Sequence, residues 1–336
     1  MAQSATFRAW LCHLPLVRPI PVGLSTWTQR PTILIEARDT SGMTGWGEAA
    51  PMDGYGPDSL EEVLQAIRTA NWTAALPSLA CGVGTALESL GSRTERRPFL
   101  GGPSSDAWSL ADATHIRPVL LHGAHGSDSD AKRYKIKVGR DAEVERALIR
   151  ERLESQPNIM VRLDANGGLT RDEALGFLDG LSAFHDRIEF FEEPYPGCFD
   201  SDQRGAFPVP LAIDESMDGD NWQHADVCVL KPSLMGDPRS TLTLASSMRE
   251  AGRRVVVSST WESRVGMLML LHLAARVGDA APGLGTYHWI EDDLGGRDPQ
   301  LLASSIDPAS LPLPAPSIHP DDLSAGASIM MVEEIR

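Results

Sequence analysis

From Ile116 onward, short apolar runs alternate with helical patterns, and this alternation constrains the fold more than any other feature of the sequence. Helical patterns such as Ala142–Glu154 and Arg171–Ala183 separate most of the runs. The runs are Val119–Leu121, Tyr134–Val138, Ile159–Leu163, Ile188–Phe191, Leu211–Ile213, Val227–Leu230 and Val255–Val257. Strands that are apolar on both faces and alternate with helices form parallel sheets built from βα units.

The number of runs favours a closed barrel over the alternative, an open doubly wound sheet. Seven runs are present, and Gly283–Tyr287 is a candidate eighth. No GxGxxG motif opens a βα unit, which argues against a dinucleotide-binding fold. We therefore predict an α/β protein with a modified TIM barrel. Residues 124–133 leave too little chain between the first two runs for a full crossover helix, so the first helix of the barrel is expected to be truncated.

The region before the barrel has a different pattern. Residues 5–50 read as antiparallel strands, with turns expected at Gly42 and Gly45. Ser59–Glu62 forms a capping box that opens a helix, and a second helix is expected at Gly84–Leu90. We predict an α+β domain at residues 1–112, completed by residues 304–336, and a barrel at residues 113–303.

Composition narrows the classes of function. The 30 basic and 46 acidic residues give a net charge of −16, which disfavours binding to nucleic acid or to an anionic membrane. Neither a secretory signal nor an apolar run of transmembrane length is present, so we expect a cytoplasmic protein. The four cysteines are scattered and lack a CxxC pair, which suits reduced thiols. The sequence leaves the oligomeric state open.

Acidic residues fall where three successive runs end. Asp164, the pair Glu192-Glu193 and Asp214 each close a run, about one βα unit apart. The carboxyl ends of barrel strands meet at one mouth, where active sites lie, so these carboxylates should converge. A hard divalent cation would relieve their repulsion, and we expect Mg²⁺, with Mn²⁺ as the second choice. For any single aspartate the alternative is a helix N-cap.

Three lysines flank these carboxylates. Lys135 and Lys137 are two residues apart on one strand and therefore share a face, while Lys231 closes the run after Asp214. Crowding or desolvation would make a lysine easier to deprotonate and turn it into a general base. A lysine on one side could take a proton α to a carboxylate while a metal stabilises the enediolate. The alternatives are solvated lysines on an edge strand and a structural ion pair at Lys231.

These residues resemble a known family. The set Lys135-x-Lys137, Asp164-x-Asn166, Glu192-Glu-Pro, Asp214-Glu-Ser and Lys231 resembles the enolase superfamily, muconate-lactonizing subgroup. Within it, three further segments are most similar to the o-succinylbenzoate synthase family. They are Gly45–Pro51, Leu230–Gly236 and Val257–Ser263.

The resemblance implies an enolase-type (β/α)7β barrel under an N-terminal α+β capping domain. It implies metal ligands at Asp164, Glu192 and Asp214. Lys137 would act as base and then acid, Lys231 would stabilise the enediolate from the opposite face, and Lys135 would tune the site. Asn166 would either support the other site residues or contact the substrate.

The implied reaction is the syn dehydration of a small carboxylate, 2-succinyl-6-hydroxy-2,4-cyclohexadiene-1-carboxylate, to 2-succinylbenzoate in menaquinone biosynthesis. We expect Ser258 and Ser259 to bind the succinyl carboxylate, with a helix N-cap as the alternative for either serine. The specificity loops are expected near residues 17–28 and 52–57.

Two other functions share this site. Racemisation of N-acylamino acids or epimerisation of dipeptides, or a cycloisomerisation, would also use lysines on both faces. The epimerases usually carry an Asp-x-Asp motif late in the barrel, where this chain has Ser258-Ser-Thr-Trp-Glu262, which disfavours them. A barrel without activity would serve as a binding protein, but the full set of ligands and lysines argues against it.

Overall fold

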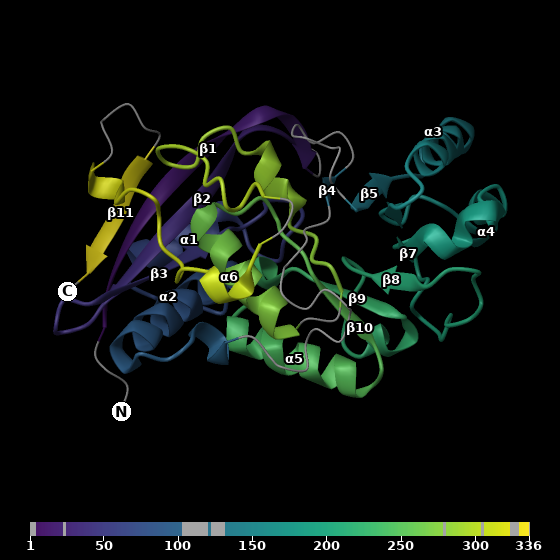
Figure 1. Cartoon of the computed structure of the whole chain (residues 1–336). Helices are drawn as coiled ribbons and strands as arrows, with labels where there is room; N and C mark the ends of the chain where they lie inside the picture. Colours follow the sequence, from purple (N-terminus) through teal and green to yellow (C-terminus); the bar gives the residue numbers. More distant parts are fainter. Residues whose placement is uncertain are drawn as a thin grey trace.

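The computed structural model describes residues 5–22, 25–102, 120–121, 132–277, 280–303, 306–322 and 329–335. The described strands form two sheets, one antiparallel with the order β11-β1-β2-β3 and one parallel with the order β10-β9-β8-β7-β6-β5-β4. The two sheets lie at opposite ends of the molecule in Figure 1. No helix in these residue ranges has the length and apolar character needed to cross a membrane.

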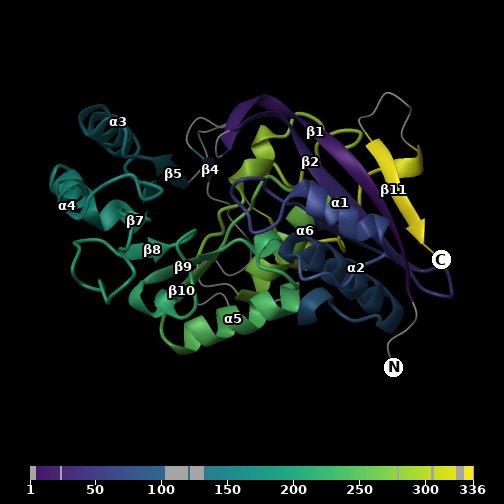
Figure 2. The ribbon, with the colours of Figure 1, turned by 180° about the vertical axis from the view of Figure 1, so that it is seen from behind.

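The antiparallel sheet is covered by helices on one face and packs toward the barrel on the other. Its strands are β1 (Thr6–Val22), β2 (Ser25–Arg38), β3 (Thr44–Ala49) and β11 (Ile329–Ile335). The helices α1 (Leu60–Arg68) and α2 (Pro77–Glu95) cover one face, as Figure 2 shows from behind. In β2, Ile33 and Ile35 pack toward these helices, whereas Leu34 belongs to the core shared with the barrel. Burial on both faces explains why this strand reads as a continuous apolar run.

The capping box at Ser59 and Glu62 is present and opens α1, as predicted. The predicted extent of the second helix is wrong, because α2 spans Pro77–Glu95 rather than Gly84–Leu90. Glycine weakens an isolated helix, but here Gly82 allows close packing, because a Cβ on residue 82 would lie 2.8 Å from the Ala49 backbone nitrogen in β3. Tertiary packing therefore extends the helix beyond its sequence signal.

Only one of the two expected turn glycines lies in a turn. Gly42 has φ +86° and donates its N–H to the Asp39 carbonyl, at 3.0 Å. Gly45 lies inside β3, where a Cβ would stand 2.2 Å from the Leu90 nitrogen. Gly45 is needed for the approach of α2 to the strand.

The parallel sheet contains all seven predicted runs in sequence order. Its strands are β4 (Leu120–Leu121), β5 (Arg133–Lys137), β6 (Met160–Asp164), β7 (Ile188–Glu192), β8 (Leu211–Ile213), β9 (Val227–Leu230) and β10 (Arg254–Val257). The helices α3 (Ala142–Ser155), α4 (Arg171–Asp179) and α5 (Pro238–Glu250) lie outside it, and α6 (Arg264–Val277) lies between the two sheets (Figure 1).

The seven-stranded parallel sheet forms a curled half-barrel beside the antiparallel N-terminal sheet, which agrees with the predicted modified barrel under an α+β domain. The candidate eighth strand is reduced to one parallel bridge between Gly283 and Ser258, and a 3-10 helix follows at Gly285–Trp289. The four cysteines, Cys12, Cys81, Cys198 and Cys228, are free and buried, as expected for reduced thiols. The short connection at 124–133 lies almost wholly outside the described residues.

The last strand returns to the first. β11 pairs antiparallel with β1, from Phe7 with Ile335 to Cys12 with Ile329. The predicted boundary between residues 112 and 113 lies outside the described residues, so the division into 1–112 with 304–336 and 113–303 stays a prediction.

Candidate active site

The predicted charged residues lie at the carboxyl ends of consecutive parallel strands. Lys137, Asp164 and Glu192 are the last residues of β5, β6 and β7, and they are partners in the strand register. Asp214 and Lys231 directly follow β8 and β9. We call this set of five residues the barrel mouth. Parallel strands in register bring their ends to one edge, so the spacing of the sequence motifs becomes proximity in space.

The lysine pair shares one carboxylate. The Nζ atoms of Lys135 and Lys137 lie 2.7 Å and 2.6 Å from Oδ2 of Asp164, and Lys135 also donates to Oε1 of Glu192 at 2.7 Å. The two side chains do share a face, as the two-residue spacing predicts. Lys135 is largely buried, whereas the Lys137 side chain is 53% exposed and therefore accessible to a small molecule.

The charges on this pair differ from the expectation for Lys135. Burial lowers the pKa of Lys135, but Asp164 and Glu192 outweigh burial, so its pKa lies above the usual range. Burial likewise raises the pKa of Asp164, but Lys135 and Lys137 outweigh it and hold that pKa below its ordinary value. The expectation that crowding would ease deprotonation is thus wrong for Lys135, because the negative partners dominate. Lys135 is a fixed cation.

Lys231 approaches the carboxylates from the other side. It donates to Oδ2 of Asp214 and to the phenol oxygen of Tyr55, and its Nζ lies 4.8 Å from the centre of the Tyr55 ring. Tyr55 belongs to the 52–57 loop of the N-terminal region, which was expected to shape specificity. Lys137 on β5 and Lys231 after β9 are therefore separated by the three strands that carry the carboxylates.

The carboxylates differ in their grouping from the prediction. Ligand oxygens of Glu192, Asp214 and Glu215 lie within 4.8 Å of one another, while Asp164 is linked to Glu192 through Lys135. Burial, and then the nearby Asp164 charge, raise the pKa of Glu192. A raised pKa is expected where buried carboxylates have too little positive charge around them. Buried carboxylate oxygens are the donors that a hard divalent cation prefers, so the residues fit Mg²⁺.

Two residues of this region have unusual backbone conformations and hold the loops in place. Asn166 (φ +45°) donates to Oε1 of Glu215 at 2.8 Å and accepts from Lys137. Glu193 (φ +41°) is buried and accepts from the Asp214 backbone N–H at 2.7 Å and from Ser216. The Glu193 side chain thus points to the loop that follows β8. Positive φ in non-glycine residues is costly and tends to occur at functional sites.

Ser258 and Ser259 are not brought to the charged cluster by any described contact. Both hydroxyls donate to the Gly283 carbonyl, at 3.3 Å and 3.0 Å, and their backbone N–H groups are bonded to Leu230 and Gly283. Neither residue caps a helix, since α6 begins at Arg264. A role for these serines in binding a carboxylate stays a prediction. In the structure their hydroxyl and backbone N–H groups donate to carbonyls of Leu230 and Gly283 at the end of the barrel.

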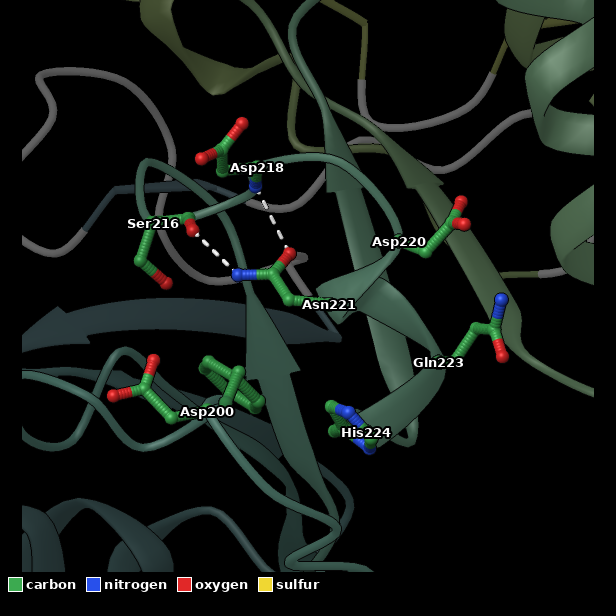
Figure 3. A pocket seen from close by; sticks show the side chains of 8 residues that line it. Asp200, Ser216, Asp218, Asp220, Asn221, Gln223 and His224 are labelled. Atoms are coloured by element: carbon green, nitrogen blue, oxygen red, sulfur yellow. Dashed lines mark hydrogen bonds between the residues drawn. The ribbon is translucent and has the colours of Figure 1, made fainter.

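An open hollow of about 700 Å³ lies beside the loop that follows Asp214. Its lining includes Asp200, Asp218 and His224 (Figure 3). Asn221 shapes this loop by donating to the Ser216 carbonyl at 2.8 Å and accepting from the Asp218 N–H at 2.9 Å. None of the predicted site residues lines this hollow.

Sequence reasoning missed two contributors. Glu215 entered only as part of the Asp214-Glu-Ser motif, and Tyr55 only as part of the 52–57 loop. Neither residue carried a local signal, because Glu215 and Tyr55 gain their roles through contacts with Asn166 and Lys231, which are distant in the sequence.

Comparison with known proteins places this arrangement in a family. The model described as "Enolase C-terminal domain-like" matches residues 124–312. An o-succinylbenzoate synthase of Edwardsiella ictaluri is 29% identical over 296 residues, which cover 80% of this chain and 87% of that protein.

Two solved structures share the fold. The o-succinylbenzoate synthase of Thermosynechococcus elongatus, which holds magnesium in its active site, has a TM-score of 0.67 at 24% identity and covers 84% of this chain and 94% of its own. The N-succinyl Arg/Lys racemase of Bacillus cereus has a TM-score of 0.77 at 18% identity and covers 98% and 100%. Since the family model spans more than half of its length, this chain belongs to the enolase C-terminal domain-like family and is an enzyme of the enolase superfamily.

Proposed function

We propose that this enzyme is an o-succinylbenzoate synthase. It would remove water from 2-succinyl-6-hydroxy-2,4-cyclohexadiene-1-carboxylate to give 2-succinylbenzoate, in menaquinone biosynthesis. The observation that carries the acid and base chemistry of the proposal is the placement of Lys137 and Lys231 on opposite sides of the buried carboxylates. The 29% identity to the Edwardsiella synthase adds support for the substrate.

Lys137, as the neutral amine, takes the proton from the carbon that bears the substrate carboxylate, because its Nζ is the exposed one of the pair. The electron pair moves into the ring, the C–O bond at the hydroxyl-bearing carbon breaks, and protonated Lys137 returns the proton to the departing hydroxide as water. Proton and leaving group thus depart on one face, which is a syn elimination. The loss of water leaves an aromatic ring, which makes the elimination favourable.

Lys231 stays protonated and faces the developing negative charge of the substrate carboxylate. Burial lowers the pKa of Lys231, but Asp214 and Glu192 raise it by more, so it stays cationic. A fixed cation aimed at developing charge stabilises the transition state without reorganising. Lys135 holds Asp164 and Glu192 in place, and Asn166 fixes Lys137 from the other side.

A divalent cation, Mg²⁺ before Mn²⁺, would be held by Asp164, Glu192 and Asp214. When bound, it supplies positive charge to the oxygens of the substrate carboxylate. The grouping of Glu215 with Glu192 and Asp214 makes Glu215 a further carboxylate beside this position.

A second candidate is racemisation of an N-succinylamino acid. Lysines on both faces could remove and return an α-proton, and the fold match to the Bacillus racemase covers almost the whole chain. The two reactions separate in one pair of assays with the same purified protein. Ultraviolet absorbance follows 2-succinylbenzoate formation, and loss of optical rotation follows racemisation of N-succinylamino acids. We expect the first to be the faster. Racemisation with no 2-succinylbenzoate formed would reject the synthase.

A further inference from the structure

Two of the sequence segments that resemble the synthase family take no part in the acid and base chemistry above. They are Gly45–Pro51 on the antiparallel sheet and Val257–Ser263 at the end of β10. In the structure they meet at Glu48, which is 3% exposed although it carries a carboxylate. We call the contact between them, made by Glu48 and Glu262 with their hydrogen-bond partners, the interdomain seam.

Glu48 reaches from β3 to the start of α6. Its Oε1 accepts from the Ser263 N–H at 3.0 Å and from the Thr32 hydroxyl at 2.6 Å. Its Oε2 accepts from the Gly266 N–H at 2.8 Å and from the Ser263 hydroxyl at 2.5 Å. A Cβ on residue 266 would stand 2.7 Å from this oxygen, so glycine is needed there. A carboxylate from one sheet thus caps a helix attached to the other.

Glu262 continues the contacts toward the barrel mouth. Its Oε1 accepts from the hydroxyls of Ser233 and Thr260, both at 2.5 Å, and its Oε2 accepts from the Thr260 N–H at 2.6 Å. Ser233 is buried and stands two residues after Lys231, separated from it only by Pro232. Between Thr260 and Glu262, Trp261 has φ +61°, a strained conformation for an aromatic residue that its neighbours must enforce.

Apolar side chains could hold the two sheets together at a lower cost in free energy, because burying a carboxylate is unfavourable even when it is hydrogen-bonded. A carboxylate gives a defined orientation instead, because four donors hold the Glu48 side chain in one position. The hydrogen bond between Glu48 and Ser263 and the one between Glu262 and Ser233 are joined by the peptide bond that links residues 262 and 263. The end of this series is the short turn that carries Lys231.

We propose that Glu48 is a positioning residue, which acts through the 260–263 segment and Ser233 to set where Lys231 stands against Asp214. The inference rests on the proposed function only for its kinetic readout. Its structural readout is independent of the reaction, since the reactivity of each of the four lysines toward an amine-labelling reagent can be measured by mass spectrometry.

Glu48→Gln is the sharpest variant, because both oxygens of Glu48 face a backbone N–H and either orientation of the amide puts an NH₂ group against one of them. Asp58→Asn is the matched control. Asp58 is also buried in the first domain and receives the N–H and hydroxyl of Ser78 at the start of α2, but on a single oxygen and with no hydrogen bond to the barrel among the described residues. Ser233→Ala removes only the last link and leaves the seam at Glu48 intact.

We expect Glu48→Gln and Ser233→Ala to lower kcat about 10- to 100-fold with a smaller change in the concentration of Mg²⁺ needed for half activity. Labelling of Lys231 should accelerate relative to exposed Lys132, and Asp58→Asn should change neither quantity. Measurements are made well below the melting temperature of each variant.

Unchanged kcat and unchanged Lys231 labelling in both variants, even with a lower melting temperature, would reduce Glu48 to a structural fastening. If Glu48→Gln does not fold, Ser233→Ala decides alone. If the wild type forms no 2-succinylbenzoate, the proposed function fails, and the labelling rates still decide the positioning role.

Discussion

Buried carboxylates occur in two regions of this molecule, and they are compensated in opposite ways. At the barrel mouth, Asp164, Glu192 and Asp214 contact the ammonium groups of lysines. In the interdomain seam, Glu48 and Glu262 receive hydrogen bonds only from neutral N–H and O–H groups among the described residues, as does nearby Asp293, and the buried guanidinium of Arg30 attracts both glutamates without a hydrogen bond to either. Cations allow charge and protons to be exchanged, whereas neutral donors fix geometry. The difference separates the place of the chemistry from the frame that holds it.

The largest expected effect is at the mouth. Lys137→Ala should lower kcat by about 10²–10⁴-fold, the usual contribution of a general acid or base, while leaving the fold intact because the side chain is half exposed. Steady-state kinetics and circular dichroism measure the two quantities. A variant that keeps more than a few per cent of the wild-type rate would remove Lys137 from the mechanism and weaken the contrast between the two regions.

The next effect tests whether the mouth takes a metal ion. Excess EDTA should abolish activity reversibly, and Mg²⁺ at about 100 times its Kd should stabilise the fold by about 2.7 kcal/mol. Thermal unfolding with and without Mg²⁺ measures this, and the shift should vanish in Asp214→Ala. Full activity in excess chelator would contradict the metal assignment.

The smallest expected effect is on the pH dependence of stability, and it comes from Asp293, which lies near the interdomain seam. Burial raises the pKa of Asp293 to about 7, although Tyr287 and the Arg264 N–H donate to it. An aspartate in the unfolded chain titrates near 3.9. Between these values the folded protein binds more protons than the unfolded chain, so this group makes stability fall as pH rises from about 4 to about 7.

Asp293→Asn keeps an oxygen for both donors and removes the buried charge. Its stabilisation relative to the wild type should be larger at pH 8.5 than at pH 5.5, by about 1–2 kcal/mol. Urea unfolding at the two pH values measures the difference, and equal stabilisation at both would show that Asp293 does not titrate in this range.

Local patterns sufficed for the barrel and most of its mouth. Runs such as Val227–Leu230 are apolar throughout because both faces are buried, and Asp164 and Glu192 end their strands in a register that follows from regular βα spacing. Local sequence patterns gave no comparable signal for contacts between segments that are far apart in the chain. Glu48 and Ser263 are 215 residues apart, and Tyr55 meets Lys231 across 176 residues. The extent of α2 was missed for a related reason, since its glycines matter only once β3 packs against them.

The pairing of the last strand with the first has a consequence for how the protein forms. β1 presents one edge to β2 within the first 40 residues, but its other edge stays open until β11 is available. During synthesis the barrel segments therefore emerge before the first sheet can be completed, and an open strand edge is a template for unwanted association. Such long-range closure favours slow folding and makes the final seven-residue strand decisive for it.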